Sequence, residues 1–226
     1  NMVGSGLKKR KSLGSDRQIK TTSTTNRGIR ILVANVQSVR NKHDELEAMC
    51  QNQKVDIVCL TETWTTSRDL DCHVTIPGYT LINRQDKDTS SGIGGGTLVL
   101  AKDDVKLIGG EKFDIPGIGS SLQATRSILI GPNFKISIVN VYRSPARKTE
   151  ESSIAALEAI FNRSGGNCLV VGDVNLPEID FEYLTTKGYP GTTLTRSLPI
   201  IEAMKNSGFE QLVDFPTRFH MLDKMK

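Results

Sequence analysis

A carboxylate and a carboxamide stand two residues apart at the end of one apolar run of this chain. Asp173-Val174-Asn175 follows directly on the run at 168–172, which reads Cys-Leu-Val-Val-Gly. Side chains two residues apart in an extended strand lie on the same face, so Asp173 and Asn175 can act on one ligand. The carboxylate can orient or deprotonate a water molecule, and the carboxamide can hold a phosphoryl oxygen. The pair is therefore half of a site for metal-assisted phosphodiester cleavage.

Two further polar residues follow apolar runs and could supply the other half of this site. Asn35 ends the run that begins at residue 29, and Glu62 comes just after the run at 55–60. A hard cation such as Mg²⁺ prefers carboxylate oxygens and keeps several waters, so one or two such residues suffice. Each also has a plainer interpretation, Asn35 as a turn residue and Glu62 as an ordinary surface acid.

Two other segments invite a phosphate-binding interpretation. Tyr142 stands near the end of another apolar run, that before Arg143-Ser144-Pro145, where its hydroxyl could contact a phosphate or could cap the core. The glycines at 92–96 lack the Gly-Lys-Ser/Thr ending of a phosphate loop and precede a strand instead of a helix. We therefore interpret these glycines as part of a hairpin.

The elements that must position these residues follow from short apolar runs separated by turn signals. Helices are predicted at about 42–52, 150–163 and 198–206, the second with Thr149 as a possible N-cap. Frequent hairpin signals in the middle of the chain indicate largely antiparallel pairing, and the pattern predicts a mixed α/β sandwich. Strands are predicted at about 29–35, 55–60, 79–83, 96–101, 105–108, 122–130, 134–143, 167–172 and 210–214.

Charge divides the 226 residues into two parts. Residues 1–28 carry a net charge of +6 with almost no large apolar side chains, whereas residues 29–226 carry −2. We predict a disordered basic tail at 1–28 and one domain at 29–226, in which nucleic-acid contacts must come from local patches. The cluster Lys8-Lys9-Arg10-Lys11 could be a nuclear-import or phosphate-contacting signal, or simply part of a solvated tail.

Cysteine use and hydropathy exclude several classes. Cys50, Cys59, Cys72 and Cys168 show no C-x-x-C spacing, and the three histidines are isolated, so free thiols in a reducing compartment are expected and a structural zinc site is not. No apolar run approaches the roughly 18 residues of a membrane span, and no signal peptide is recognisable. We expect a soluble intracellular protein. The first residue, Asn1, and the last, Lys226, both suggest cuts in a longer reading frame.

In order along residues 29–223, six segments resemble the endonuclease/exonuclease/phosphatase superfamily, and more closely the endonuclease domain of non-LTR (LINE-type, jockey-like) retrotransposons. The resemblance implies a four-layer α/β sandwich, in which two mixed and largely antiparallel β-sheets pack face to face with helices outside. The segments are Ala34-Asn35-Val36-Gln37-Ser38 with Asn41-Lys42, Leu60-Thr61-Glu62-Thr63-Trp64, Gly94-Gly95-Gly96, Asn140-Val141-Tyr142-Arg143-Ser144-Pro145, Gly172-Asp173-Val174-Asn175-Leu176-Pro177, and Pro216-Thr217-Arg218 with Leu222-Asp223.

The resemblance also implies an activity. It is Mg²⁺-dependent nicking of DNA, with Mn²⁺ as a possible substitute, which generates the 3′-hydroxyl that primes reverse transcription. DNA would be the partner in the nucleus, without a membrane or small-molecule cofactor, and the full-length protein could also engage element RNA and a reverse-transcriptase domain.

Individual roles carry over from the resemblance. Glu62 is implied as the direct metal ligand, with Asn35 positioning the metal. Asp173 would orient the attacking water, Asn175 would stabilise the phosphoryl oxygens, and Tyr142 would contact the scissile phosphate. Further contacts with substrate are implied for Thr217 and Arg143, and orientation of a catalytic histidine for Asp223.

The sequence departs from the family pattern at its end. The family closes its site with a Ser-Asp-His motif, whereas this sequence stops at Lys226, and His220 precedes Asp223 and is no substitute. We therefore expect a domain that is incomplete at its C-terminus and that nicks DNA very weakly or not at all. Two rivals remain: an abasic-site nuclease or other phosphodiesterase of the superfamily, and a non-catalytic remnant of a retroelement.

Overall fold

The computed structural model describes residues 28–87, 94–110, 113, 115, 121–145, 150–164, 166–177, 179–180, 185–186 and 197–213. The predicted tail at 1–27, the N-cap Thr149, and the site residues Thr217 and Asp223 lie outside these ranges. The strand predicted at 210–214 is wrong for its described part, because residues 210–213 have no regular secondary structure.

Four strands form the first sheet, in the order β1-β2-β4-β3. The strands are β1 (Ile31–Asn35), β2 (Ile57–Thr61), β3 (Tyr79–Gln85) and β4 (Thr97–Lys102). A short 3₁₀ helix, η1 (Arg40–Lys42), and the helix α1 (His43–Gln53) cross from β1 to β2, so these two strands pair in parallel. β4 pairs with β2 and with β3 in antiparallel fashion. A second short 3₁₀ helix, η2 (Asp71–His73), precedes β3.

The second sheet has the order β5-β6-β7-β8. Its strands are β5 (Leu107–Gly109), β6 (Leu122–Ile130), β7 (Lys135–Arg143) and β8 (Cys168–Asp173). β6 and β7 form a long antiparallel hairpin, and α2 (Glu150–Arg163) crosses from β7 to a parallel β8. Two short strands that the sequence did not predict, β9 (Ile179–Asp180) and β10 (Thr185–Thr186), and the helix α3 (Leu198–Asn206) follow.

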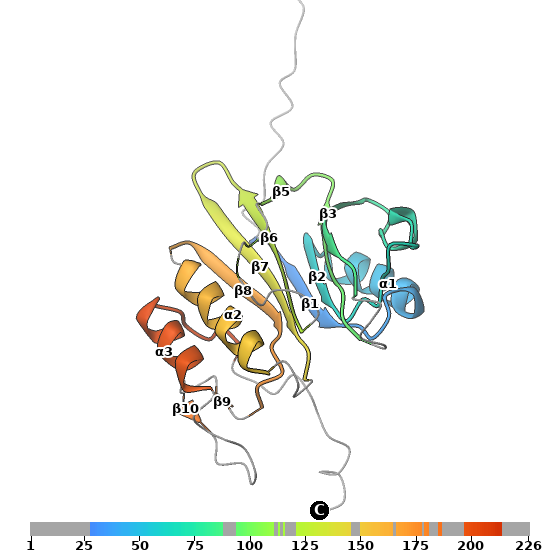
Figure 1. Ribbon diagram of the computed structural model, residues 1–226. Coiled ribbons are helices and arrows are strands. Elements are labelled where there is room, and N and C mark those ends of the chain that lie inside the picture. The colour runs from blue at the N-terminus through green and yellow to red at the C-terminus, as the bar shows by residue number, and fades with distance from the viewer. Residues whose placement is uncertain are drawn as a thin grey trace, which may run out of the picture.

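Helices cover the outer faces of the two sheets, as Figure 1 shows. Leu46 and Cys50 of α1 pack with Leu60 of β2 and the neighbouring strands of the first sheet. Leu157 of α2 and Ile200 of α3 belong to the core on the outer face of the second sheet. The predicted fold class, an α/β sandwich of two mixed sheets flanked by helices, is confirmed.

The space between the sheets changes from apolar to polar toward one end. The apolar part consists of Ile57, Cys59, Val99, Ala101, Leu107, Leu129 and Ile138. Further along the strands, the alternation of side chains brings four polar residues to the same inner faces. Thr61, Thr97 and Asn140 each stand two residues beyond a member of the apolar part, and Thr125 is in register with Asn140. We call these four residues the polar layer.

Asn140 joins the two sheets within this layer. It is fully buried, and its Nδ2 donates hydrogen bonds to the backbone oxygens of Leu60 (3.0 Å) and Leu98 (3.4 Å). Asn140 Oδ1 and the three threonine hydroxyls have no hydrogen-bond partner among the described residues. Such groups are costly to bury and are uncommon in protein cores.

No helix within the described ranges combines the length and the hydropathy needed to cross a membrane.

Candidate active site

The parallel pairing of β1 and β2 places Asn35 beside Glu62. Asn35 is in register with Thr61, the residue before Glu62. Beyond the strands the two loops continue to pair, because Ser38 N–H donates to the Glu62 carbonyl (2.9 Å) and Val39 N–H to the Thr63 carbonyl (3.0 Å). The two polar residues therefore leave the same edge of the first sheet side by side.

The loop that carries Glu62 has an unusual backbone. Glu62 and Trp64 have positive φ angles of 50° and 57°, which few residues other than glycine adopt. On its other side the loop bonds to the glycine segment, since Trp64 N–H donates to the Gly95 carbonyl (3.0 Å). A side chain at Gly96 would overlap the Thr63 hydroxyl, so the close approach requires glycine there. Such backbone strain clusters at functional sites.

The second sheet contributes Tyr142 and Asp173 from adjacent parallel strands. Tyr142 of β7 is in register with Asp173 of β8. Gly172 just before it has a φ of 124°, and a Cβ atom there would overlap the Val141 carbonyl oxygen. This glycine lies within β8, whereas Asn175, with a φ of 47°, begins the turn that follows.

Asn35 connects the two halves of the site. Its Nδ2 donates to Glu62 Oε1 (3.1 Å) and to Asp173 Oδ2 (2.8 Å), a residue 138 positions away in the sequence. Tyr142, a residue only 3% exposed, lies close enough to both carboxylates for their charges to act on its hydroxyl. Burial, followed by the nearby charges of Glu62 and Asp173, raises the pKa of Tyr142 to about 12. The structure thus brings together four of the predicted residues.

The donor set at this place fits a hard divalent cation. Two carboxylates converge on a single amide NH₂ group, which already supplies partial positive charge where a cation would be stabilised. In the described part of the chain, no three carboxylate, imidazole or thiolate groups gather in a metal-binding arrangement. A cation here would therefore have Glu62 and Asp173 as its carboxylate ligands, and Mg²⁺ typically binds one or two carboxylates and keeps several waters.

Asn175 lies next to this group, but its side chain is partly engaged. Its backbone N–H donates to Asp173 Oδ1 (3.1 Å), and its Nδ2 donates to the backbone oxygen of Arg143 (2.7 Å). One of the two Nδ2 hydrogens is used in this bond, which leaves the second for a phosphoryl oxygen.

Arg143 is buried beside the site, and its side chain is bonded within the protein. The residue is 2% exposed, and its guanidinium donates to Ser153 Oγ (3.1 Å) and to the backbone oxygens of Val174 (3.1 Å) and Asn175 (2.9 Å). The side chain is therefore buried and bonded to α2 and to the turn after Asp173, and the contact with substrate stays a prediction. The roles of Thr217 and Asp223 stay predictions, since both lie outside the described residues.

Sequence reasoning missed Gln123, which holds the glycine segment against the site. Gln123 is 2% exposed and is in register with Tyr142. Its Oε1 accepts a bond from Gly96 N–H (2.6 Å), and its Nε2 donates to the Asp86 carbonyl (2.7 Å). A polar residue on the inner face of a predicted strand was the only available signal, and it carries no indication of a partner.

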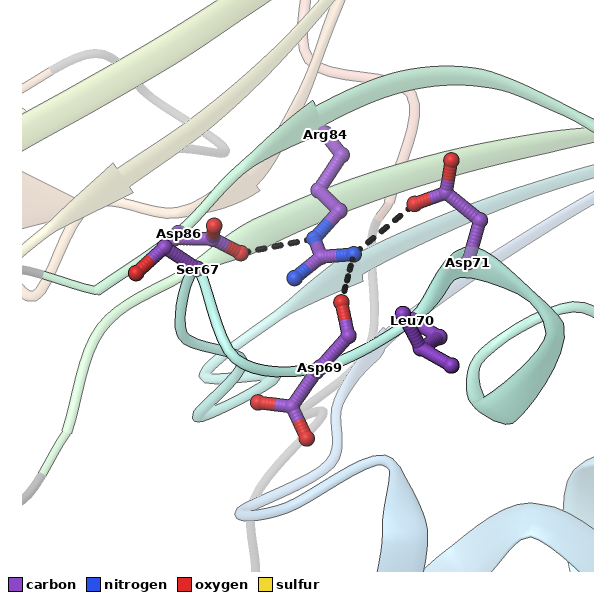
Figure 2. A pocket seen from close by; sticks show the side chains of 6 residues that line it. All are labelled: Ser67, Asp69, Leu70, Asp71, Arg84 and Asp86. Carbon is purple, nitrogen blue, oxygen red and sulfur yellow. Dashed lines mark hydrogen bonds and ion pairs between the residues drawn. The ribbon is translucent and has the colours of Figure 1, made fainter.

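A second charged cluster supports the loop behind Glu62. Figure 2 shows Arg84 of β3 among acidic residues that line a pocket of about 430 Å³. The guanidinium bonds to Asp86 (2.6 Å), to Asp71 (2.8 Å) and to the backbone oxygen of Thr66 (2.6 Å). Burial raises the pKa of Asp69, but bonds from Thr66 and the charges of Arg40 and Arg84 lower it overall. The cluster anchors residues 66–71 to β3 and so stabilises the loop that begins at Glu62.

Solved structures with this fold include several DNA-processing enzymes. The AP endonuclease LMAP of Leishmania major superposes with a TM-score of 0.54 at 16% identity, over 79% of this chain and 66% of that one. The endonuclease domain of TRAS1, a telomere-specific non-LTR retrotransposon, gives 0.54 at 15% identity, over 80% and 72%. The 3′ phosphatase NExo from Neisseria, bound to a product DNA hairpin, gives 0.51 at 17% identity, over 69% and 61%. The chain therefore spans less than two thirds of the Leishmania and Neisseria chains.

No curated protein sequence matches the chain significantly. A family model, by contrast, matches residues 32–219. This range includes the four residues that meet in the site, namely Asn35, Glu62, Tyr142 and Asp173. This chain belongs to the Endonuclease/Exonuclease/phosphatase family.

Proposed function

We propose that this chain is the DNA-nicking endonuclease domain of a non-LTR retrotransposon protein, and that it works with Mg²⁺. One observation carries the proposal: Asn35 joins Glu62 and Asp173 from the two sheets, beside the buried hydroxyl of Tyr142. This arrangement presents two carboxylates, an amide and a phenol at one edge of the sandwich, which suits hydrolysis of a phosphodiester.

Each residue has a part that its position supports. Asp173 accepts a proton from the attacking water and orients it toward phosphorus, while its second oxygen is held by Asn35. The free hydrogen of Asn175 Nδ2 and the Tyr142 hydroxyl donate to phosphoryl oxygens, and the phenol remains protonated because its pKa is about 12. When bound, Mg²⁺ supplies positive charge that stabilises the leaving oxygen.

Sequence motifs support the retrotransposon type over the abasic-site type. The Tyr142-Arg143-Ser144-Pro145 and Pro216-Thr217-Arg218 segments resemble those of retrotransposon endonucleases. Under this proposal the domain acts on chromosomal DNA in the nucleus, and the nick serves a reverse-transcriptase domain and its element RNA. The negative charge of residues 29–226 implies that contacts with DNA are local.

Plasmid nicking tests the proposal. Supercoiled plasmid is incubated with excess protein and Mg²⁺, and the open-circular product is followed over time. We expect slow Mg²⁺-dependent nicking that falls about 10²-fold or more in Glu62→Gln and Asp173→Asn. Asp44→Asn, an exposed acid at the start of α1, is the matched control and should keep the wild-type rate.

Two further results separate the rival functions. Preferential cleavage of an oligonucleotide with an abasic site would favour the repair type. If the wild-type chain and Glu62→Gln give the same trace of nicking, and neither binds Mg²⁺ in a calorimetric titration, the proposal is wrong and a non-catalytic descendant is favoured.

A further inference from the structure

We propose that Arg143 is a positioning residue that locks the turn after Asp173 into the geometry required for catalysis. This inference rests on the proposed function, because it assigns a task in that same site. It replaces a contact between Arg143 and substrate with a contact between Arg143 and the turn formed by Asp173, Val174 and Asn175.

Arg143 and Asn175 are bound to each other in both directions. The Arg143 guanidinium donates to the Asn175 carbonyl (2.9 Å), and the Asn175 side chain donates to the Arg143 carbonyl (2.7 Å). A third bond runs from the guanidinium to the Val174 carbonyl (3.1 Å). The turn is thereby held at the positive φ of Asn175, a conformation that asparagine adopts more readily than other side chains and that these bonds fix in place.

The clamp is itself anchored on α2. Arg143 Nε donates to the hydroxyl of Ser153, and both residues are almost completely buried, at 2% and 1% exposure. The alternation of side chains along β7 explains why Arg143 points toward α2. Tyr142 faces the space between the sheets, so the next residue, Arg143, must face the helices. The planar guanidinium can bond to α2 and to two turn carbonyls at once, which a lysine ammonium on a flexible stem does poorly.

The clamp acts on the proposed reaction through Asp173. The Asn175 backbone N–H donates to Asp173 Oδ1 (3.1 Å), while Asn35 donates to Asp173 Oδ2 (2.8 Å). Both carboxylate oxygens are therefore oriented by neighbours, and one of these neighbours is the residue that Arg143 holds. A release of the turn would free Asp173 to rotate and would cost catalytic rate, because misplacement by about 1 Å can reduce a rate about 10²-fold.

Arg143→Lys tests the clamp, because it keeps the positive charge but loses the planar fork. Arg126→Lys is the matched control, since Arg126 of β6 also bonds to a serine hydroxyl, that of Ser137 (2.7 Å). The measurements are hydrogen exchange of the Asn175 backbone and side-chain amides, the single-turnover nicking rate with Mg²⁺, and the salt dependence of DNA affinity. Circular dichroism and urea unfolding establish that each variant is folded.

We expect Arg143→Lys to increase the exchange of both Asn175 amides at least about tenfold and to lower the nicking rate about tenfold or more. DNA affinity and its salt slope should remain those of the wild type. The inference is overturned if the exchange of both Asn175 amides is unchanged while the affinity for DNA falls, because the planar guanidinium would then contact DNA instead of the turn.

Two measurements test the inference even if the wild-type chain is inactive or Arg143→Lys does not fold. If the wild-type chain neither nicks DNA nor binds Mg²⁺, the proposed function fails, while amide exchange still reports on the clamp. If Arg143→Lys does not fold, Ser153→Ala removes the anchor, and we expect faster exchange of the Asn175 amides in that variant. Unchanged exchange in a folded Ser153→Ala, together with wild-type guanidinium NMR signals that move on addition of DNA, would overturn the clamp.

Discussion

Asn140→Asp is the substitution that most directly tests the polar layer between the sheets. The change is nearly isosteric, and it replaces an NH₂ group that donates to the Leu60 and Leu98 carbonyls with an oxygen. While the new side chain is protonated, its hydroxyl can still donate to one carbonyl. The loss should then be about 1 kcal/mol, the contribution of one hydrogen bond.

Ionisation makes the same substitution far more costly. Asn140 is fully buried and faces two carbonyl oxygens, so a carboxylate here would lose its hydration and meet like partial charges. Burial of this kind raises the pKa of a carboxyl by about 3–5 units. Because the folded pKa is raised above the unfolded value of about 3.9, the folded state loses stability as the pH rises above about 4.

Urea unfolding at about pH 4.5 and about pH 7.5 measures this dependence. The cost rises toward ~1.4 kcal/mol for each pH unit between the unfolded and the folded pKa, so the difference between variant and wild type should grow by ~3–4 kcal/mol. Asn133→Asp, in the exposed turn between β6 and β7, is the control and should show almost no such growth. A difference for Asn140→Asp that does not change with pH would refute the buried, sheet-joining position assigned to this residue.

Three further changes probe the candidate site itself. Asn35→Asp adds a third carboxylate beside Glu62 and Asp173, so without Mg²⁺ the variant should unfold at a lower temperature than the wild type. Added Mg²⁺ should raise the unfolding temperature of the variant more than that of the wild type. An equal rise in both would contradict the cation site. Tyr142 has a pKa of about 12 in the folded chain against an ordinary value of about 10, so the free energy of unfolding should fall as the pH rises from 10 to 12. Denaturation curves recorded over this pH range should show a smaller fall for Tyr142→Phe. Gly172→Ala, at a φ of 124° and against the Val141 carbonyl, should cost at least ~3 kcal/mol in thermal unfolding, whereas Gly166→Ala, at a φ of 83° in open space, should cost about 1 kcal/mol.

Most strands were predictable because their apolar runs are bounded by glycine, proline and asparagine turns. β6 was predicted with the bounds it has, and β7 to within one residue, because the turn at 131–134 separates two long alternating runs. The failures have a common cause, which is that local pattern says little about very short or isolated segments. β9 and β10 have two residues each and show no period, and the apolar residues near 212 are exposed instead of paired.

The site could be predicted where a polar residue ends or directly follows an apolar run. Asn35, Glu62 and Asp173 all do so, and parallel pairing then brought them to one edge. Arg143 could not be assigned from its motif, although the alternation after Tyr142 already indicated that the two side chains face opposite ways. Its partners depend on how α2 crosses the sheet, which no local pattern encodes. Gln123 depends likewise on the register of β6 with β7.

The hydrogen bond between Asn35 and Asp173 has a consequence for the order of folding. It closes a loop of 138 residues, and the crossover helices within that loop can form earlier from local contacts alone. Long-range pairings of this kind form slowly, because the entropy of closing the loop is lost before the contacts stabilise it. The two carboxylates therefore converge only when both sheets have docked. Divalent-ion binding during refolding should accordingly appear with the slowest phase, which would make the cation a kinetic probe of the finished sandwich.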